Sequence, residues 1–260
     1  MILDEIIAAK HQEVEAAKER LPFAELEVRL RGRLAERSFR RALMRSGRLS
    51  LIAELKRKSP SRGMLRERFD PVSLAQQLQE AGASALSVLT DEQFFGGSLD
   101  FLRDVQSFTE VPILRKDFVI DPYQVYEAAY YQADAVLLIV QVLTEGELMR
   151  SLQAADSLGM DALVEVHTEG DLHTALRSGA HLIGINHRDL RTFEVRSDTT
   201  AQLVPKIPAG KLIVAESGVK TREDVQQLKD LGVQAVLIGE ALMTAPDVAA
   251  KVRELFDGIW

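Results

Sequence analysis

The stretch Lys211-Leu-Ile-Val-Ala-Glu-Ser-Gly218 decides the fold, because a short apolar run ends abruptly in an acid, a hydroxyl and a glycine. This pattern predicts a buried parallel strand whose carboxyl end carries a reactive group and a turn with an exposed backbone. The pattern returns at 235–240 as Ala-Val-Leu-Ile-Gly-Glu, and weaker forms of it occur upstream. The repetition indicates that one structural unit recurs along the chain.

Strand-like runs continue from residue 49 to the end of the chain, and helical patterns lie between them. The eight runs are 49–55, 85–90, 111–114, 135–140, 162–166, 182–186, 212–217 and 235–239. The expected N-terminal caps of the helices are Asp70-Pro71, Asp121-Pro122, Thr144, Thr168 and Thr221. The expected C-terminal glycines are Gly82, Gly159, Gly179 and Gly232.

A strand–helix unit that repeats eight times with short connections predicts a parallel sheet with right-handed crossovers. Eight such units favour a closed (β/α)8 TIM barrel, an α/β fold that commonly fills one domain of this length. An open doubly wound sheet is the alternative, but residues 54–60 supply no glycine-rich turn after the first strand. We therefore predict a single domain, 1–260, with the barrel at 49–260.

Residues 1–48 are expected to form a helical N-terminal extension that packs on the barrel. One-sided apolar spacing predicts helices at 2–19 and 23–30. Eight arginines follow in 29–48, which would suit a nucleic-acid-binding arm, yet apolar residues are interleaved and few aromatic residues are available for base stacking. We therefore favour a packing face, made of Leu30, Leu34, Phe39, Leu43 and Met44.

The composition is that of a globular protein. Apolar residues make up 46% of the 260 residues and charged residues 27%, with a net charge of −7 that disfavours non-specific binding to nucleic acid. No apolar run is long enough to span a bilayer, and no signal peptide is evident. Cysteine is absent, which excludes disulfides and cysteine nucleophiles and agrees with a cytoplasmic location.

Charged side chains stand at the predicted strand ends, which converge on one mouth of a barrel. Glu54 and Lys56 share a face because they are two residues apart in an extended segment. Glu165 lies inside an apolar strand, where a buried carboxylate needs a cation or donors, and Lys56 and Lys116 are available. Interspersed acids and lysines in a closed mouth suit acid–base chemistry, although strands can also simply end in polar residues.

The last two strand ends point to a second role. Ser217-Gly218 and Gly239-Glu240 leave backbone N–H groups unobstructed by bulky side chains. The loops after strands seven and eight of a barrel commonly bind phosphate. The two glycines could instead serve only tight turns, but their occurrence in adjacent repeats favours a phosphate site.

Several motifs in fixed order resemble the indole-3-glycerol-phosphate synthase family of tryptophan biosynthesis. They begin with Ile52-Ala-Glu-Leu-Lys-Arg-Lys-Ser-Pro-Ser61 and Pro112-Ile-Leu-Arg-Lys-Asp-Phe-Val119. The others are Leu89-Thr90, Phe95 with Gly97-Ser98, and the stretches 163–169, 183–190, 214–218 and 237–243. The resemblance covers nearly the whole chain, including the helical extension.

The resemblance implies ring closure, decarboxylation and dehydration of 1-(2-carboxyphenylamino)-1-deoxyribulose 5-phosphate. An acid must protonate the ketone that the aryl ring attacks, and the family pattern assigns this to Lys116. A hydroxyl must also leave, which requires a second acid and a base. We expect Glu165 to be the base and Lys56 to be the partner of the substrate carboxylate or the second acid.

The remaining site residues are carried over from the family pattern by position. The supporting residues that hold lysines and substrate hydroxyls are Glu54, Asn186 and Glu216. The residues expected on the phosphate and substrate side are Ser59, Arg188, Ser217, Gly218, Gly239 and Glu240, the last through its backbone N–H. The expected apolar wall for the aryl ring is Pro60, Phe95, Phe118, Leu137 and Leu190. The loop 56–66 is expected to act as a lid.

No metal and no cofactor is expected, because the histidines lack ligand spacing and the decarboxylation electrons can flow into the substrate's own iminium. We interpret His187 as an incidental exposed residue beside the mouth. The expected partner is a small phosphorylated substrate, with no nucleic acid or membrane, and the chain is expected to be a monomer.

Two other classes were weighed against this interpretation. A phosphoribosylanthranilate isomerase-like barrel resembles the last two strands, but that family uses a cysteine and an aspartate, and this chain has no cysteine. A non-enzymatic binding module that uses the arginine-rich 29–48 segment would leave the charged strand ends unexplained.

Overall fold

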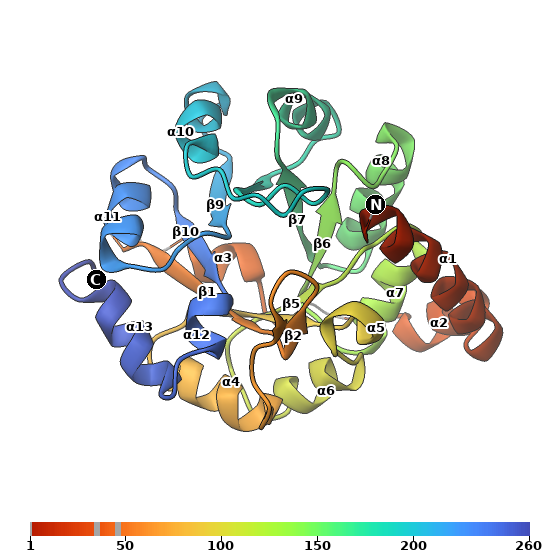
Figure 1. The fold of residues 1–260 in the computed structure, drawn as a ribbon. Coiled ribbons are helices and arrows are strands. Elements are labelled where there is room, and N and C mark those ends of the chain that lie inside the picture. Colours follow the sequence, from red (N-terminus) through yellow and green to blue (C-terminus); the bar gives the residue numbers. More distant parts are fainter. Residues whose placement is uncertain (1, 34–36, 45–47) are drawn as a thin grey trace.

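The computed structural model describes residues 2–33, 37–44 and 48–260, and eight parallel strands close into a barrel within it (Figure 1). Around the barrel the strands follow the chain order, and the last strand pairs with the first. The barrel strands are β1 Ser50–Leu55, β4 Ala85–Leu89, β5 Ile113–Lys116, β6 Ala135–Ile139, β7 Asp161–Val166, β8 Leu182–Asn186, β9 Leu212–Glu216 and β10 Ala235–Ile238. The predicted TIM barrel is therefore confirmed.

Helices alternate with these strands and form the outer ring in Figure 1. The helices that follow the first barrel strand are α4 Pro71–Glu80, α5 Glu92–Phe95, α6 Asp100–Gln106, α7 Tyr123–Tyr130, α8 Glu145–Ser157, α9 Glu169–Arg177, α10 Thr199–Leu203, η1 Val204–Lys206, α11 Arg222–Asp230, α12 Glu240–Met243 and α13 Val248–Phe256. A short hairpin, β2 Lys58–Ser59 and β3 Gly63–Met64, stands between β1 and α4.

The local signals explain where the helices begin and end. Thr144, Thr168 and Thr221 each form a complete capping box with the residue three positions later. Asp70 caps α4 ahead of Pro71 as expected, whereas α7 begins at Tyr123, one residue later than Asp121-Pro122 suggested. The four glycines expected at helix ends all have positive φ, the conformation that glycine adopts without strain.

The third barrel strand differs from the prediction. It was expected at 111–114 but runs from Ile113 to Lys116, and it pairs with β4 from Leu86 to Leu89. Apolar patterning favoured the earlier segment because charged residues are rare in buried strands. Arg115 and Lys116 nevertheless belong to the strand, since each meets charged partners on its own side of the sheet.

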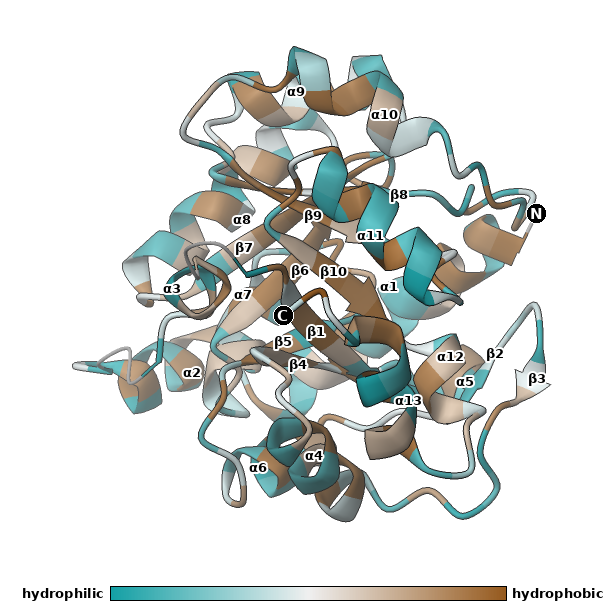
Figure 2. Cartoon of the chain, turned by 90° about the vertical axis from the view of Figure 1, so that its left-hand side faces the viewer, coloured by the Kyte–Doolittle hydropathy of each residue, from teal (hydrophilic) through white to brown (hydrophobic). Residues whose placement is uncertain are grey.

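Residues of β1 alternate between two cores, as the strand period requires. Ile52 points into the barrel, where it packs with residues of the other strands, whereas Ala53 and Leu55 pack outward against the helices. Helix α3, Phe39–Leu43, closes the amino-terminal end of the barrel: Phe39 and Leu43 are fully buried in the interior core. In Figure 2 the hydrophobic strands occupy the centre, with α3 and the β2–β3 hairpin at opposite ends.

Two further helices of the extension, α1 Ile2–Arg20 and α2 Phe23–Leu30, lie beside α7. Helix α1 also reaches the mouth of the barrel, where Leu3 and Ile6 line the main cavity. The predicted packing face is partly wrong, because Met44 is 66% exposed beyond the end of α3. Leu34 of that face, like Arg45 of the arginine-rich segment, lies outside the described residues.

Two arginines in the described part of the extension form hydrogen bonds to the base of the barrel. Arg33 donates to the carbonyls of Ala133 and Leu158, and Arg37 donates to those of Thr109 and Val111. These guanidinium groups satisfy carbonyls where strands enter the barrel, which supports the packing interpretation over a nucleic-acid arm. None of the described helices combines the length and apolarity required to cross a membrane.

Candidate active site

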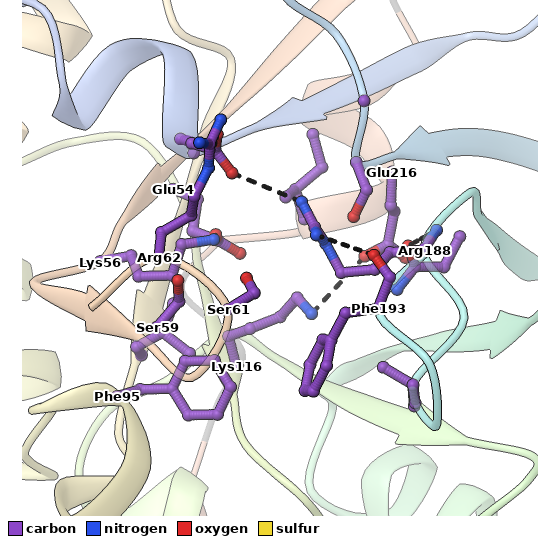
Figure 3. A pocket seen from close by; sticks show the side chains of 18 of the residues that line it. Glu54, Lys56, Ser59, Ser61, Arg62, Phe95, Lys116, Arg188, Phe193 and Glu216 are labelled. Carbon is purple, nitrogen blue, oxygen red and sulfur yellow. Dashed lines mark hydrogen bonds and ion pairs between the residues drawn. The ribbon is translucent and has the colours of Figure 1, made fainter. Parts of the chain in front are cut away.

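The mouth of the barrel encloses a cavity of about 720 Å³, large enough for a small phosphorylated aromatic molecule. Carboxyl ends of strands from around the barrel line it, and α1 and the β2–β3 hairpin complete its walls. Figure 3 shows charged side chains from several of these elements converging on this space. Every residue that the sequence placed in the site lines this cavity.

Three ionisable groups form the centre of the site, which we call the mouth triad: Lys116, Glu165 and Glu216. The Lys116 Nζ lies 3.6 Å from Oε2 of Glu165 and 3.7 Å from Oε2 of Glu216. Both carboxylates are buried at their strand ends, and none of their oxygens has a hydrogen-bond partner among the described residues. The triad therefore holds polar atoms that a ligand can satisfy.

Burial and mutual repulsion set the protonation of the triad. Burial alone would lower the pKa of Lys116, but Glu165, Glu216 and Glu54 outweigh it and raise that pKa above its ordinary value. Burial and then the charge of Glu165 raise the pKa of Glu216 to about 8, although Lys116 opposes the shift. The site therefore presents a charged ammonium beside a Glu216 carboxyl that holds its proton more tightly than an ordinary glutamate.

Glu54 and Lys56 form a second pair on the wall of the mouth. The Lys56 Nζ donates to Oε1 of Glu54 at 2.6 Å. Burial would raise the pKa of Glu54, but Lys56 and Lys116 hold it below its ordinary value. A side chain on Gly239 would place its Cβ 2.3 Å from the same Glu54 oxygen, so this close approach requires glycine.

Arg188 lies at the side of the cavity nearest the last two strands. Its Nη2 is 3.4 Å from Oε2 of Glu240, and its backbone N–H donates to Oδ1 of Asn186 at 3.0 Å. The Glu240 side chain also pairs with Arg62 of the hairpin at 2.8 Å. Glu240 was expected to act through its backbone N–H, and sequence reasoning missed this side-chain bridge between two arginines.

The turn after β9 has unusual backbone geometry. Ser217 and Gly218 both have positive φ, 66° and 82°, and both line the cavity. His187 does not lie exposed as expected: it is 5% exposed, and its ring contacts the Ser217 carbonyl and the Thr200 hydroxyl. Burial lowers the pKa of His187, and the ring fastens the end of β8 to this turn.

An apolar wall faces the triad. Phe95 and Phe118 lie with ring centroids 6.1 Å apart, and Leu137 and Leu190 line the same cavity. Asp91 caps α5 by accepting the N–H groups of Phe94 and Phe95, which sets the position of the first ring. Pro60 and Ser59 of the hairpin line the cavity from above.

The loop expected to act as a lid forms the β2–β3 hairpin. Lys58 Nζ donates to the Gln93 carbonyl beside α5, and Arg62 reaches Glu240 at the start of α12. The hairpin therefore spans the mouth between the aromatic wall and the last loop. The described residues include no group of three or more His, Asp or Glu side chains placed to hold a metal ion.

Two buried residues near the mouth were not found from the sequence. Lys10 of α1 pairs with Asp91 at 3.1 Å and with Asp117 at 2.9 Å. No sequence motif in α1 predicts these ion pairs. His167 lies 3.3 Å from Glu165, and its spacing of two residues along the strand was a usable signal.

Comparison with known proteins places this site in a family. The model of the family described as "Indole-3-glycerol phosphate synthase" matches residues 3–255. The indole-3-glycerol phosphate synthase of Alkaliphilus metalliredigens is 43% identical over 259 residues, with 100% of this chain and 99% of that protein covered. That of Acetivibrio thermocellus is 46% identical over 256 residues, with 98% of each covered.

Solved structures add a likeness of fold alone. A 3-hexulose-6-phosphate synthase superposes with a TM-score of 0.65 at 16% identity, covering 82% of this chain and 100% of that one. The curated relatives match over 98–100% of this chain, and their names agree with the resemblance read from the motifs. The chain belongs to the indole-3-glycerol phosphate synthase family.

Proposed function

We propose that the mouth triad catalyses the reaction of this family. The function is that of an indole-3-glycerol phosphate synthase of tryptophan biosynthesis, a carboxy-lyase that acts on a phosphorylated small molecule. The observation that supports the residue assignment is a buried ammonium between two carboxylates whose oxygens lack hydrogen bonds, at the base of the cavity.

Lys116 acts as the general acid in ring closure. The aryl carbon that bears the carboxylate attacks the ketone carbon, and the ketone oxygen takes a proton from Nζ. The neighbouring carboxylates keep the ammonium protonated until the substrate arrives, because they raise its pKa. After the transfer, the buried neutral amine leaves the triad short of one positive charge, so reprotonation from Glu216 or solvent is favoured.

Lys56 serves as the partner of the substrate carboxylate. Its ammonium is already paired with Glu54 at 2.6 Å, so a second carboxylate can bind to the same cation from the cavity side. Loss of CO₂ from the closed ring then restores the aromaticity of the benzene ring. Lys56 or Lys116 protonates the departing hydroxyl, and Glu165 removes the proton whose loss completes the second ring.

The phosphate binds at the opposite side of the mouth. Ser217 and Gly218 present backbone N–H groups in a positive-φ turn, and Gly239-Glu240 begins the short helix α12. Arg188 supplies the charge, with Ser59 above it on the hairpin. Asn186 supports this side, since its side chain accepts from the Arg188 backbone.

The aryl ring rests on the apolar wall of Phe95, Phe118, Leu137 and Leu190, with Pro60 above. Figure 3 shows Phe95 of this wall and Arg188 on different sides of the mouth with Lys116 between them, so the substrate would extend from the wall to the phosphate side past the triad. A fluorescence assay tests the function: the chain is incubated with the carboxyphenylamino deoxyribulose phosphate, and indole emission is followed. No emission above a Lys116→Ala control would contradict the proposal.

A monomeric state and a cytoplasmic location stay predictions. We propose a monomer because this one chain supplies the acid–base groups, the apolar wall and the phosphate loops of the proposed site. Sedimentation at micromolar concentration checks it, and a species of twice the 28.9 kDa chain mass would contradict it.

A further inference from the structure

Glu165 is a fully buried carboxylate on β7. Its neighbours in the strand, Val164 and Val166, are also completely buried. Lys116 approaches Oε2 at 3.6 Å, but neither oxygen of Glu165 has a hydrogen bond among the described residues. A base must present one defined oxygen to the proton that it removes, so something must fix the rotation of this carboxylate.

His167 lies on the other side of the same carboxylate. Its Nε2 is 3.3 Å from Oε1 of Glu165, the oxygen that Lys116 does not approach, and only 7% of its side chain is exposed. Neither ring nitrogen has a hydrogen bond in the described part of the chain. His167 is not among the residues that line the cavity, so it contacts the carboxylate from outside the space that the substrate would fill.

The start of α9 holds His167 in this place. The backbone N–H groups of His167 and Thr168 both donate to Oδ2 of Asp171, at 3.0 Å each. Gln141 donates to the same oxygen at 3.0 Å. The backbone of His167 is therefore fixed, with its ring Nε2 within 3.3 Å of Oε1 of Glu165.

We propose that His167 is a positioning residue for Glu165, and this inference rests on the proposed role of Glu165 as base. The Nε2–H of His167 donates to Oε1, which leaves Oε2 directed at Lys116 and the substrate. Hydrogen bonds of this kind are often long before substrate binds and tighten in the complex. The arrangement is a base oriented by a third group, here from the same strand end.

A matched pair of variants tests the proposal. Glutamine and methionine are unbranched and similar in length, but only glutamine can donate to Oε1. In steady-state kinetics, His167→Met should lower kcat at least about tenfold with KM within about twofold, whereas His167→Gln should stay within about threefold of the parent chain. His173→Met is the control, because His173 is exposed on α9 beyond the mouth.

Three outcomes would overturn the inference: equal kcat for both His167 variants, a KM change without a kcat change, or a His173→Met loss of the same size. Thermal unfolding of each variant identifies any loss that comes from misfolding. A Glu165→Gln,His167→Met double variant should be no slower than Glu165→Gln alone, since the donor then has no base to orient. If Glu165→Gln itself is fully active, the proposed base fails, which is a separate result.

Discussion

Strand β5 and the residue after it place two kinds of buried charge side by side. Arg115 and Asp117 belong to what we call the rim network, with Lys10, Asp91 and Glu127, whereas Lys116 between them belongs to the mouth triad. The rim contacts between opposite charges measure 2.9–3.1 Å. The triad contacts measure 3.6 and 3.7 Å and leave carboxylate oxygens unpaired.

This difference in contact distance and pairing indicates that the rim charges stabilise the fold, whereas the triad charges are available to bind a ligand. Arg115 contacts Asp117, Glu127 and the Gln124 carbonyl, so carboxylates of the protein itself neutralise its charge. Lys116 shares one ammonium between two carboxylates and keeps room for a third group. Burial is similar in both clusters. Among the described residues one rim oxygen, Oδ2 of Asp91, lacks a hydrogen bond, whereas all four carboxylate oxygens of the triad lack one. The number of unpaired oxygens, rather than depth, therefore distinguishes the two roles.

Replacement of the triad lysine should have the largest effect on catalysis. Lys116→Ala should reduce turnover about 10⁴-fold, the upper end for loss of an acid–base group, and should leave the fold intact. Indole fluorescence measures the rate, and thermal unfolding checks the fold. A rate within tenfold of the parent chain would remove Lys116 from the acid role.

Removal of the rim lysine should instead cost stability. Lys10→Met leaves Asp91 and Asp117 buried without their shared cation, so the free energy of unfolding should fall by about 3–5 kcal/mol. Lys18→Met on the same helix is the control, because its ion pairs are partly exposed and should be worth at most about 1 kcal/mol. Urea unfolding measures both, and equal losses would contradict the distinction.

Replacement of Glu165, the proposed base, should have the next largest effect. Glu165→Gln should lower kcat at least about 10²-fold while the free energy of unfolding changes little or rises, because the amide relieves a buried charge. Single-turnover kinetics with excess enzyme would measure the chemical step directly. A loss smaller than threefold would exclude Glu165 as the base.

The two clusters should also show opposite pH dependences of stability. The Glu216 pKa of about 8 lies above its ordinary 4.5, so the stabilisation that comes with its proton is complete below pH 4.5 and is lost as the pH rises to about 8. The Asp117 pKa of about 2 lies below its ordinary 3.8, so its contribution of about 2 kcal/mol is present above pH 3.8 and is lost as the pH falls to about 2.

Unfolding measured across this range in two variants checks the signs. Relative to the parent chain, Glu216→Gln should gain stability progressively from pH 5 to 8, because it removes a carboxyl that becomes charged there. Asp117→Asn should show its full penalty at neutral pH and a smaller one toward pH 2. Parallel curves for the two variants would mean that triad and rim do not differ in this respect.

Much of the fold was readable from the sequence because each unit carries its own signals. The threonine capping boxes and the glycines with positive φ depend on neighbours in the chain, so they could be recognised without tertiary contacts. The start of β5 was misplaced because Arg115 is buried against Glu127 of α7, a contact that no local pattern encodes. The exposure of Met44 was missed for the same reason.

The residues of the candidate site could be predicted from the sequence about as well as the fold. Strand ends collect at one mouth in any barrel, so Glu54, Glu165 and Glu216 could be placed together without coordinates. Lys10 could not, because it comes from a helix outside the repeated unit and its partners are set by how α1 packs. The burial of His187 was missed since its partner Thr200 follows a long loop.

The docking of the extension at both ends of the barrel bears on how the chain reaches its native state. Synthesis releases the extension first, yet the carboxylate that receives α3, Asp161, begins β7, and the partners of Lys10 follow β4 and β5. The extension is synthesised first, but it is among the last segments that can pack in its native position. Until β7 forms, α3 lacks the carboxylate that fixes it at the base of the interior core.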